Sequence, residues 1–306
     1  MVIRNFLFHR VSDESDSMWP PMTPLLFSNV ISFLRKKYQV VALEEFLDEP
    51  NSFKGIKKGI ATISFDDGYK DNIEYAAPIL KKYNCPSSFY IVTDCIDRNV
   101  PTWTNLIDHA FQQSKKSKLV LAFDFVPEKF KFVSLNPDPT NIVKTIKPWM
   151  KGLSNVERVK ITESILQQCD DVTQPDNKMM NWEDIAQLAN DGFIIGSHSY
   201  SHPMLASLKN ESEIIDELKI SADRIKEKIG IAPKAISYPI GSFDERVTRL
   251  SKEQGYKYGL AVEQKFFSFA SDNMAIPRVE LYQQPWWKVK LHLTGNYWNR
   301  LRRVIK

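Results

Sequence analysis

Two adjacent carboxylates follow an apolar run near residue 65. Residues 63–65 lead directly into Asp66, Asp67 and Gly68. Neighbouring side chains at the end of a strand point in different directions, so one acid can bind a metal ion while the other accepts a proton. The glycine lets the chain turn tightly after them. A plain Asp-Asp-Gly turn with solvated acids explains the same residues, and this segment alone does not separate the two interpretations.

Two histidines, His198 and His202, follow a second apolar run, in the segment GSHSYSHP. Histidines at i and i+4 converge on one face of a helical turn, which is the geometry that a divalent metal needs for two imidazole ligands. With 5 histidines in the chain, this separation arises by chance in about 6% of such sequences. If both segments end strands of one α/β sheet, they meet at one edge and offer a carboxylate and two imidazoles to one ion.

Strand-like runs alternate with segments of helical periodicity along the chain, which is typical of an α/β domain with parallel strands. One helix is expected after Asn210 and ends at Gly230, and another begins after Asp71. The expected strands are 3–8, 60–65, 87–92, 192–195 and 235–238.

The stretch from about 114 to 180 interrupts this alternation. It contains two strand-like pieces, 119–125 and 130–135, and two helical runs, 142–150 and 156–169. It has no Pro/Gly/Ser-rich linkers on both sides, so we interpret it as an insertion in a single domain 1–306. Its helices are expected to form a lid or a partner surface.

Composition excludes several classes of protein. With 306 residues, 43% of them hydrophobic and 25% charged, the chain has enough apolar material for a large core. A net charge of +4 is too small to indicate nucleic-acid binding. The 3 cysteines form no disulfide framework, and charged residues interrupt the first apolar run before it could act as a secretory signal. We therefore expect a soluble, cytoplasmic protein without a membrane-spanning helix.

The C-terminal segment 285–306 is basic and is expected to be helical. One interpretation is a last helix that packs on the domain with a solvated basic face. The alternative is peripheral contact with an anionic membrane. Its cations, with no acid among them, are Lys288, Lys290, Arg300, Arg302, Arg303 and Lys306.

A third segment, SYPIG at 237–241, would by itself be an ordinary turn after a strand. Taken together, SFDDG, GSHSYSH and SYPIG, in that order, resemble the polysaccharide deacetylases of the NodB-homology type, carbohydrate esterase family 4. The resemblance extends from about residue 3 to residue 280, with the insertion interrupting it. It implies a distorted (β/α)7-type barrel. It also implies a metal-dependent hydrolase that removes N-acetyl groups from an amino sugar of a poly- or oligosaccharide, in surface exopolysaccharide biosynthesis.

The resemblance also assigns roles to individual residues. Asp66 corresponds to the catalytic base, and Asp67, His198 and His202 correspond to the ligands of a divalent metal, most often zinc. In such a site the ion activates a water and polarises the acetyl carbonyl.

The third segment corresponds to the part of the family pocket that lies near the oxyanion. Tyr238, Pro239 and Ile240 are therefore expected to line the substrate pocket, and the Ile240 backbone N–H to stabilise the oxyanion. The family usually carries here an arginine that orients the base, but this chain has Ser237 or a neighbour instead. The family's fourth motif, with its tryptophan, is not recognisable either. Arg278 is our candidate for the missing cation, and an ordinary surface arginine is the alternative.

The general acid of the family is the histidine of a Leu-x-His motif. The segment around His292 has poor spacing for it, whereas Leu7-Phe8-His9 fits. Some exopolysaccharide deacetylases have this motif permuted to the first strand, and the FHRV of this chain resembles theirs. We therefore expect His9 to donate the proton, with a structural histidine at a strand end as the alternative. His109 is expected to be structural or at the rim.

Two other functions remain open at this point. One is removal of a formyl or another small acyl group from a lipid-linked sugar. The other is a non-catalytic carbohydrate-binding relative. The incomplete third motif and the unrecognisable fourth motif favour this function, whereas the presence of the base and all three metal ligands argues against it.

Overall fold

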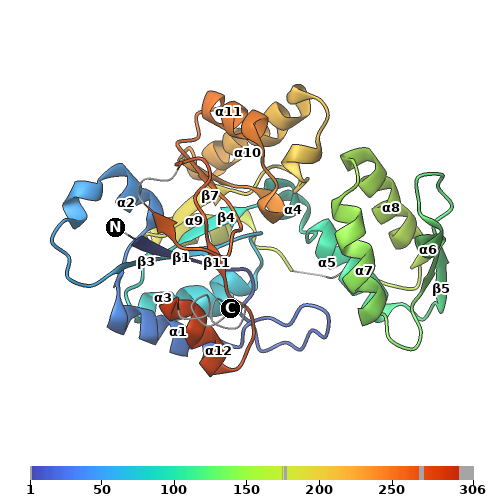
Figure 1. The fold of residues 1–306 in the computed structure, drawn as a ribbon, viewed down its shortest axis with the longest axis horizontal. Helices are drawn as coiled ribbons and strands as arrows, with labels where there is room; N and C mark the ends of the chain where they lie inside the picture. The colour runs from blue at the N-terminus through green and yellow to red at the C-terminus, as the bar shows by residue number, and fades with distance from the viewer. Residues whose placement is uncertain (1, 174, 176–177, 269–271, 296–306) are drawn as a thin grey trace, which may run out of the picture.

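A curled, nearly all-parallel sheet forms the centre of the molecule in the computed structural model, which describes residues 2–173, 175, 178–268 and 272–295 (Figure 1). The sheet path is β10-β1-β3-β4-β7-β8-β9, with β11 beside β1 and β2 beside β3, and only β10 runs antiparallel to its neighbour. The strands are β1 (Val2–Phe8), β2 (Gln39–Val40), β3 (Ile60–Phe65), β4 (Ser88–Ile91), β7 (Ile194–Ser197), β8 (Ala235–Ser237), β9 (Tyr258–Leu260), β10 (Phe267–Ser268) and β11 (Val279–Glu280).

The curl brings the far end of the sheet back toward β1. A parallel bridge joins Leu260, at the end of β9, to Ile276. The chain then continues into β11, which pairs with β1. The fold is therefore the partly closed (β/α)7-type barrel that the resemblance implied, and each of the five strands expected for the sheet is present within one or two residues of its expected bounds. In the insertion, the strand-like piece 119–125 was too long, because the strand there ends at Val120.

Helices cover the outside of this sheet, and their apolar faces explain why they form. The helix expected after Asn210 is α10. It begins with a capping box between Asn210 and Glu213 and ends at Gly230, which has a φ of 76°. The helices around the sheet are α1 (Pro24–Lys37), α2 (Leu43–Asp48), α3 (Ala77–Lys82), α4 (Thr93–Arg98), α9 (Trp182–Asn190), α10 (Glu211–Ile229), α11 (Glu245–Glu253) and α12 (Trp286–Thr294).

The helix expected after Asp71 begins differently from the prediction. Residues 72–76 form a π-helical turn, η2 (Asn72–Ala76), and only then does the chain continue as α3. Pro78 near the start of α3 has no N–H to complete the α-helical hydrogen bonds of the preceding turn. Periodicity alone does not report this change, because the apolar residues keep nearly the same spacing.

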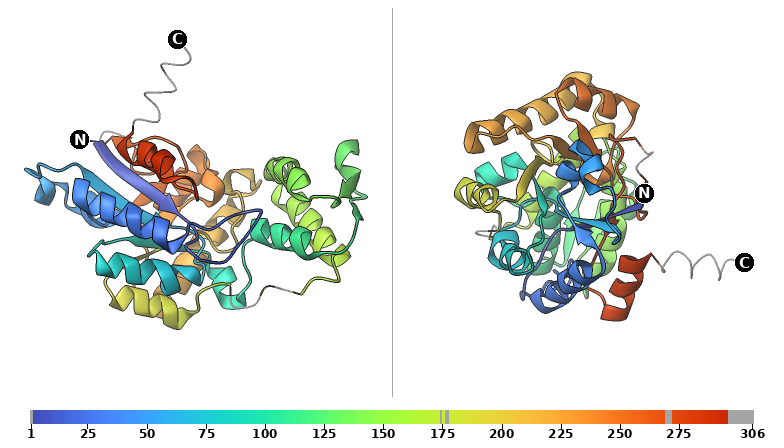
Figure 2. Two further views of the ribbon diagram at one scale, coloured as in Figure 1. Left: turned by 90° about the horizontal axis from the view of Figure 1, so that it is seen from below. Right: turned by 90° about the vertical axis from the view of Figure 1, so that its left-hand side faces the viewer.

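The insertion projects to one side of the barrel in two perpendicular views (Figures 1 and 2). It has its own hydrophobic cluster, which includes Phe111, Val133, Ile146 and Ile165. The helix before residue 114 also contributes to this cluster, so the insertion begins at α5, earlier than the expected residue 114. The elements of the insertion are α5 (Trp103–Gln113), β5 (Lys118–Val120), α6 (Glu128–Lys131), β6 (Phe132–Ser134), α7 (Thr140–Lys151) and α8 (Asn155–Gln168).

The start of the basic C-terminal segment forms α12, which contacts α1. Val289 and Leu293 are buried, whereas the Trp287 side chain is 58% exposed. Residues 296–306, with the remaining cations, lie outside the described residues, so membrane contact and the location in the cell stay predictions. Within the described residues, no helix combines the length and apolar character needed to cross a bilayer.

Gly196→Ala is expected to destabilise the barrel. Gly196 lies in β7, where an added Cβ would come within 2.3 Å of the Tyr90 ring. Such overpacking typically costs about 1–3 kcal/mol, which chemical denaturation would measure. Gly152→Ala is the control, because its Cβ would lie 3.3 Å from the nearest atom, the Trp149 carbonyl oxygen. Equal unfolding free energies for both variants would contradict the expected contact.

Candidate metal and catalytic site

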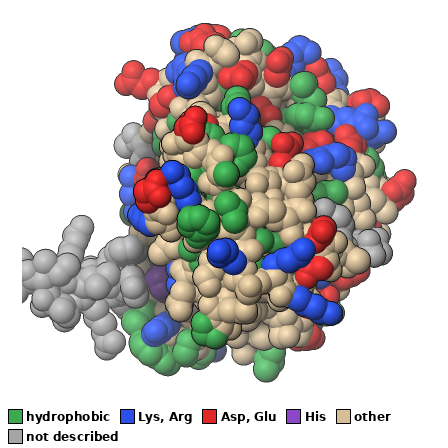
Figure 3. Space-filling model, turned by 90° about the vertical axis from the view of Figure 1, so that its right-hand side faces the viewer, with side chains coloured by type: hydrophobic (Ala, Val, Ile, Leu, Met, Phe, Trp, Pro, Cys, Tyr) green, Lys and Arg blue, Asp and Glu red, His purple; other side chains and the backbone are tan. Residues whose placement is uncertain are grey.

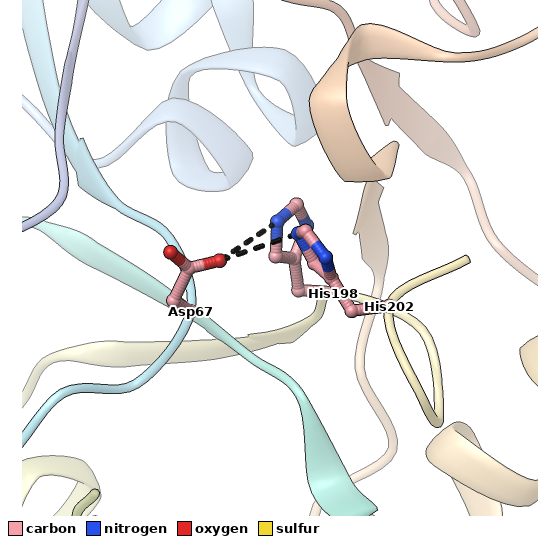
Figure 4. A group of neighbouring side chains, drawn as sticks. All are labelled: Asp67, His198 and His202. Carbon is pink, nitrogen blue, oxygen red and sulfur yellow. Dashed lines mark ion pairs between the residues drawn. The ribbon is translucent and has the colours of Figure 1, made fainter. Parts of the chain in front are cut away.

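The two sequence motifs meet at the carboxyl edge of the sheet. Asp67 follows β3, and the loop with His198 and His202 follows β7. Oδ1 of Asp67 lies 3.4 Å from Nε2 of His198 and 3.5 Å from Nε2 of His202 (Figure 4). All three side chains are buried, and one ligand atom from each lies within 4.8 Å of the others. The structure thus places the three expected ligands around one point.

The chemistry of these donors fits a divalent ion such as zinc. Oδ1 of Asp67 is buried and has no hydrogen-bond partner among the described residues. Nδ1 of His198 donates to the carbonyl oxygen of Ser237 at 2.7 Å, which leaves Nε2 free to act as a ligand. Burial lowers the pKa of His202 to about 3, so its imidazole is neutral, as metal binding requires.

The two histidines do not converge through a helical turn, as the sequence analysis expected. Residues 198–204 form a loop, in which Ser199 and His202 adopt left-handed backbone angles, with φ of 65° and 61°. Such angles are rare for residues other than glycine and are found where the surrounding structure enforces them. Glu217 of α10 holds the loop by accepting a hydrogen bond from the Ser201 backbone N–H at 2.8 Å.

Asp66 is held by two side chains from distant parts of the chain. Arg278 donates two hydrogen bonds to its carboxylate, at 2.8 and 2.7 Å, and Ser237 donates a third at 2.8 Å. Burial would raise the pKa of Asp66, but the Arg278 charge and its hydrogen bonds hold that pKa below the usual range. Asp66 is therefore an ionised carboxylate in a fixed orientation, 3.9 Å from Nε2 of His198.

Arg278 itself is completely buried, so the alternative of an ordinary surface arginine is wrong. The place where the family usually carries its arginine is occupied by Ser237, which accepts a hydrogen bond from Arg278 at 2.7 Å. The serine and the arginine together occupy the space beside the base. A bidentate arginine fork of this kind fixes a carboxylate more rigidly than a single cation would.

These residues open into one pocket of about 370 Å³. It is lined by Asp66, Asp67, His198, His202, His9, Trp19, Thr104, Asp108, Lys147, Lys151, Ile240, Val262, Glu280 and Tyr282. Base, expected metal ligands and expected proton donor are thus within reach of one bound molecule.

His9 lies at the end of β1 and faces this pocket. Its Nδ1 is 3.3 Å from Oε1 of Glu280, and its carbonyl oxygen accepts a hydrogen bond from Asn72 at 2.7 Å. The His9 and Trp19 rings pack in an edge-to-face arrangement, with their centres 5.5 Å apart. His292, the rejected alternative, belongs to α12 and is not part of the pocket lining.

Of the third segment, only Ile240 lines the pocket, so the expectation for the side chains of Tyr238 and Pro239 was wrong. Side chains alternate along a strand, and Ser237 points inward to Asp66. Tyr238 therefore points away from the barrel interior. There it is buried under the surrounding helices and stacks on Phe243, with the ring centres 5.0 Å apart. Ile240 has a φ of 58°, a strained conformation for a β-branched residue.

His109 lies in the insertion and not in the pocket, and its Nε2 is 3.0 Å from the Thr173 carbonyl oxygen. Sequence reasoning missed several lining residues. Glu280 had a signal, because it is two residues after Arg278 and so shares a strand face with it. The others had none that we recognised: Trp19, Thr104, Asp108, Lys147, Lys151, Val262 and Tyr282.

Comparisons with known proteins identify the family of this chain. Residues 54–259 match the family model described as polysaccharide deacetylase. A peptidoglycan-N-acetylglucosamine deacetylase of Bacillus cereus is 35% identical over 72 residues, which are 24% of this chain and 26% of that protein. The chain thus matches only about a quarter of this relative's length.

Two solved structures share the fold at low sequence identity. A deacetylase of Streptococcus pyogenes, PplD in complex with acetate, has a TM-score of 0.61 at 15% identity, over 92% of this chain and 93% of that chain. A de-N-acetylase of Aggregatibacter actinomycetemcomitans has a TM-score of 0.61 at 17% identity, over 95% and 100% of the two chains. With the family model covering more than half of its residues, the chain belongs to the polysaccharide deacetylase family.

Proposed function

We propose that this protein is a metal-dependent hydrolase that removes N-acetyl groups from an amino sugar of a poly- or oligosaccharide. One observation carries the proposal: a buried carboxylate and two imidazoles converge on one point beside a base that Arg278 locks in place. A carbohydrate-binding module would have no need for an ionised, immobilised carboxylate next to such a set. The resemblance of the FHRV segment to that of exopolysaccharide deacetylases supports a role in surface-polysaccharide assembly as part of this proposal.

The residues divide the reaction between them. Asp67, His198 and His202 would hold zinc or a similar ion, which would supply Lewis acidity toward the acetyl carbonyl and the attacking water. Asp66 takes a proton from this water, because its lowered pKa keeps it ionised and Arg278 keeps it oriented. The backbone N–H of Ile240, at the pocket wall, donates to the developing oxyanion.

His9 completes the hydrolysis from the other side of the pocket. As the C–N bond breaks, His9 gives its proton to the nitrogen, so that the products are a free amine and acetate. Glu280 lies against Nδ1 and orients the ring, and its Oε2 in turn accepts a hydrogen bond from Tyr282. This contact leaves Nε2 as the ring nitrogen that would give its proton to the substrate.

The direct test is release of acetate from an N-acetylglucosamine oligomer. Acetate is expected with the purified protein and is lost after chelation, returning when zinc is added. Release of formate from an N-formylated analogue, without acetate from the N-acetylated oligomer, would support the deformylase alternative. Binding of the oligomer without turnover, unchanged by chelation, would support a non-catalytic role.

Glu280→Gln is expected to lower kcat about tenfold, because it replaces the carboxylate that contacts Nδ1 of His9 by a neutral amide. Steady-state kinetics on the same oligomer would measure the change, with little effect on KM. Glu253→Gln, on the exposed surface of α11, is the control. An unchanged kcat for Glu280→Gln would show that this contact does not assist the proton donor.

A further inference from the structure

The insertion forms one wall of the active-site pocket. Thr104 and Asp108 of α5 and Lys147 and Lys151 of α7 line the same pocket as the metal triad. Residues four apart on a helix lie on the same side, so α7 presents both lysines to the pocket. This wall is independent of the residues that carry out the proposed chemistry.

Most charged side chains around the pocket have a close partner in the protein. Asp67 faces the expected ion, Asp66 pairs with Arg278, and Asp108 pairs with Lys147. In the described part of the chain, no carboxylate lies within ion-pair distance of Lys151. Its ammonium group is therefore available to an anionic group of a bound molecule.

Asp108 and Lys147 stabilise this wall. Asp108 is 2% exposed and accepts two hydrogen bonds from Nζ of Lys147, at 2.8 and 2.6 Å. The pair fixes α7 against α5, one turn before Lys151. Burial and the neighbouring Lys147 charge lower the pKa of Lys151, and the more distant charges of Glu280 and Asp108 oppose this shift without cancelling it. An anion placed between the two ammonium groups would relieve this repulsion.

A further cation lies in the insertion, on α8. Arg158 is 3% exposed, its guanidinium lies 5.1 Å from the centre of the Trp103 ring, and its Nη1 has no hydrogen-bond partner among the described residues. The insertion thus carries a buried cation in addition to the two lysines of the pocket wall. Such positive charge favours an anionic group on a molecule bound in the pocket.

The outer surface on the side of the insertion has a different distribution of charge from the pocket wall. There, Lys and Arg side chains are interspersed with Asp and Glu side chains (Figure 3). The lysines of the pocket wall therefore do not simply reflect a basic subdomain. A neutral sugar would leave Lys151 without an ion-pair partner, whereas an acidic one would supply it.

We propose that the substrate carries an anionic group, a carboxylate or a phosphate ester, close to the N-acetylated sugar, and that Lys151 binds this group. The inference rests on the proposed deacetylase function and specifies the substrate class of that same pocket. Lys147, held by Asp108, positions the helix that carries Lys151. The insertion is then the part of the chain that selects acidic polysaccharides.

The test compares three N-acetylglucosamine oligomers: a neutral one, one alternating with a uronic acid, and one carrying 6-phosphate groups. Acetate release gives kcat/KM for each. Wild-type protein is expected to prefer at least one acidic oligomer, and the two acidic substrates distinguish carboxylate from phosphate. Lys151→Gln is expected to reduce the acidic-to-neutral ratio about tenfold, mainly through KM, because one charge-assisted hydrogen bond is lost.

Two variants make the result specific. Lys151→Arg is expected to retain most of the preference, because the positive charge remains. Lys144→Gln removes an equal charge from an exposed position of α7 outside the pocket lining and is expected to leave the ratio unchanged. A Lys151→Gln ratio equal to that of wild type would overturn the inference while acetate release still supports the deacetylase function. Absence of acetate from all three oligomers would instead reject the proposed function, and this inference with it.

Discussion

Asp66→Asn is expected to lower kcat/KM by about a hundred- to ten-thousandfold, the usual contribution of a general base. The amide cannot accept the proton of the attacking water, although it has nearly the same size and shape. The expected metal ligands are other residues, so the metal content of the variant should match that of wild type. Kinetics and elemental analysis on the same preparation would measure both.

The substitution also leaves Arg278 buried without its carboxylate. Breaking a buried ion pair on one side typically costs about 3–5 kcal/mol of stability, so the variant must be assayed well below its melting temperature. Arg278→Lys is a useful companion, because it keeps the charge but cannot make the bidentate contact. It should retain more activity than Asp66→Asn. Wild-type kinetics in a folded, metal-loaded Asp66→Asn protein would rule out Asp66 as the base.

His198→Ala and His202→Ala are expected to abolish activity by removing the metal. Changing residues that merely support metal ligands costs about 10- to 100-fold in metal affinity, and losing a ligand itself should cost at least as much. Zinc titration of the chelator-treated protein would show this directly. Far-UV circular dichroism would confirm that each variant is folded.

His109→Ala provides the matched control, because this histidine lies in the insertion and contacts the Thr173 carbonyl oxygen. It should bind zinc and turn over substrate like wild type. Equal zinc affinity in His109→Ala and His198→Ala would contradict the proposed ligand set.

The sequence predicted the parts of this site that depend on local pattern. An apolar strand followed by polar residues identified Asp66, Asp67, His198 and His202, and parallel topology explains why these strand ends meet. The loop geometry at His202 was not predictable, because it depends on left-handed angles that the surrounding structure enforces.

Contacts between distant segments were harder to predict. Arg278 and Asp66 are 212 residues apart and meet only because the sheet curls until β11 pairs with β1. Nothing in the local sequence of Arg278 distinguishes it from a surface arginine. The same holds for Lys151, because periodicity predicts helix α7 but not how the insertion lies against the barrel.

The central claim is that Asp67, His198 and His202 together hold one metal ion. Anomalous diffraction from crystals of the wild-type protein grown with zinc, recorded on both sides of the zinc absorption edge, tests it most directly. The account predicts a strong peak between the three side chains, in contact with all of them. A peak elsewhere in the molecule, or none at this position in zinc-loaded crystals, would contradict the account.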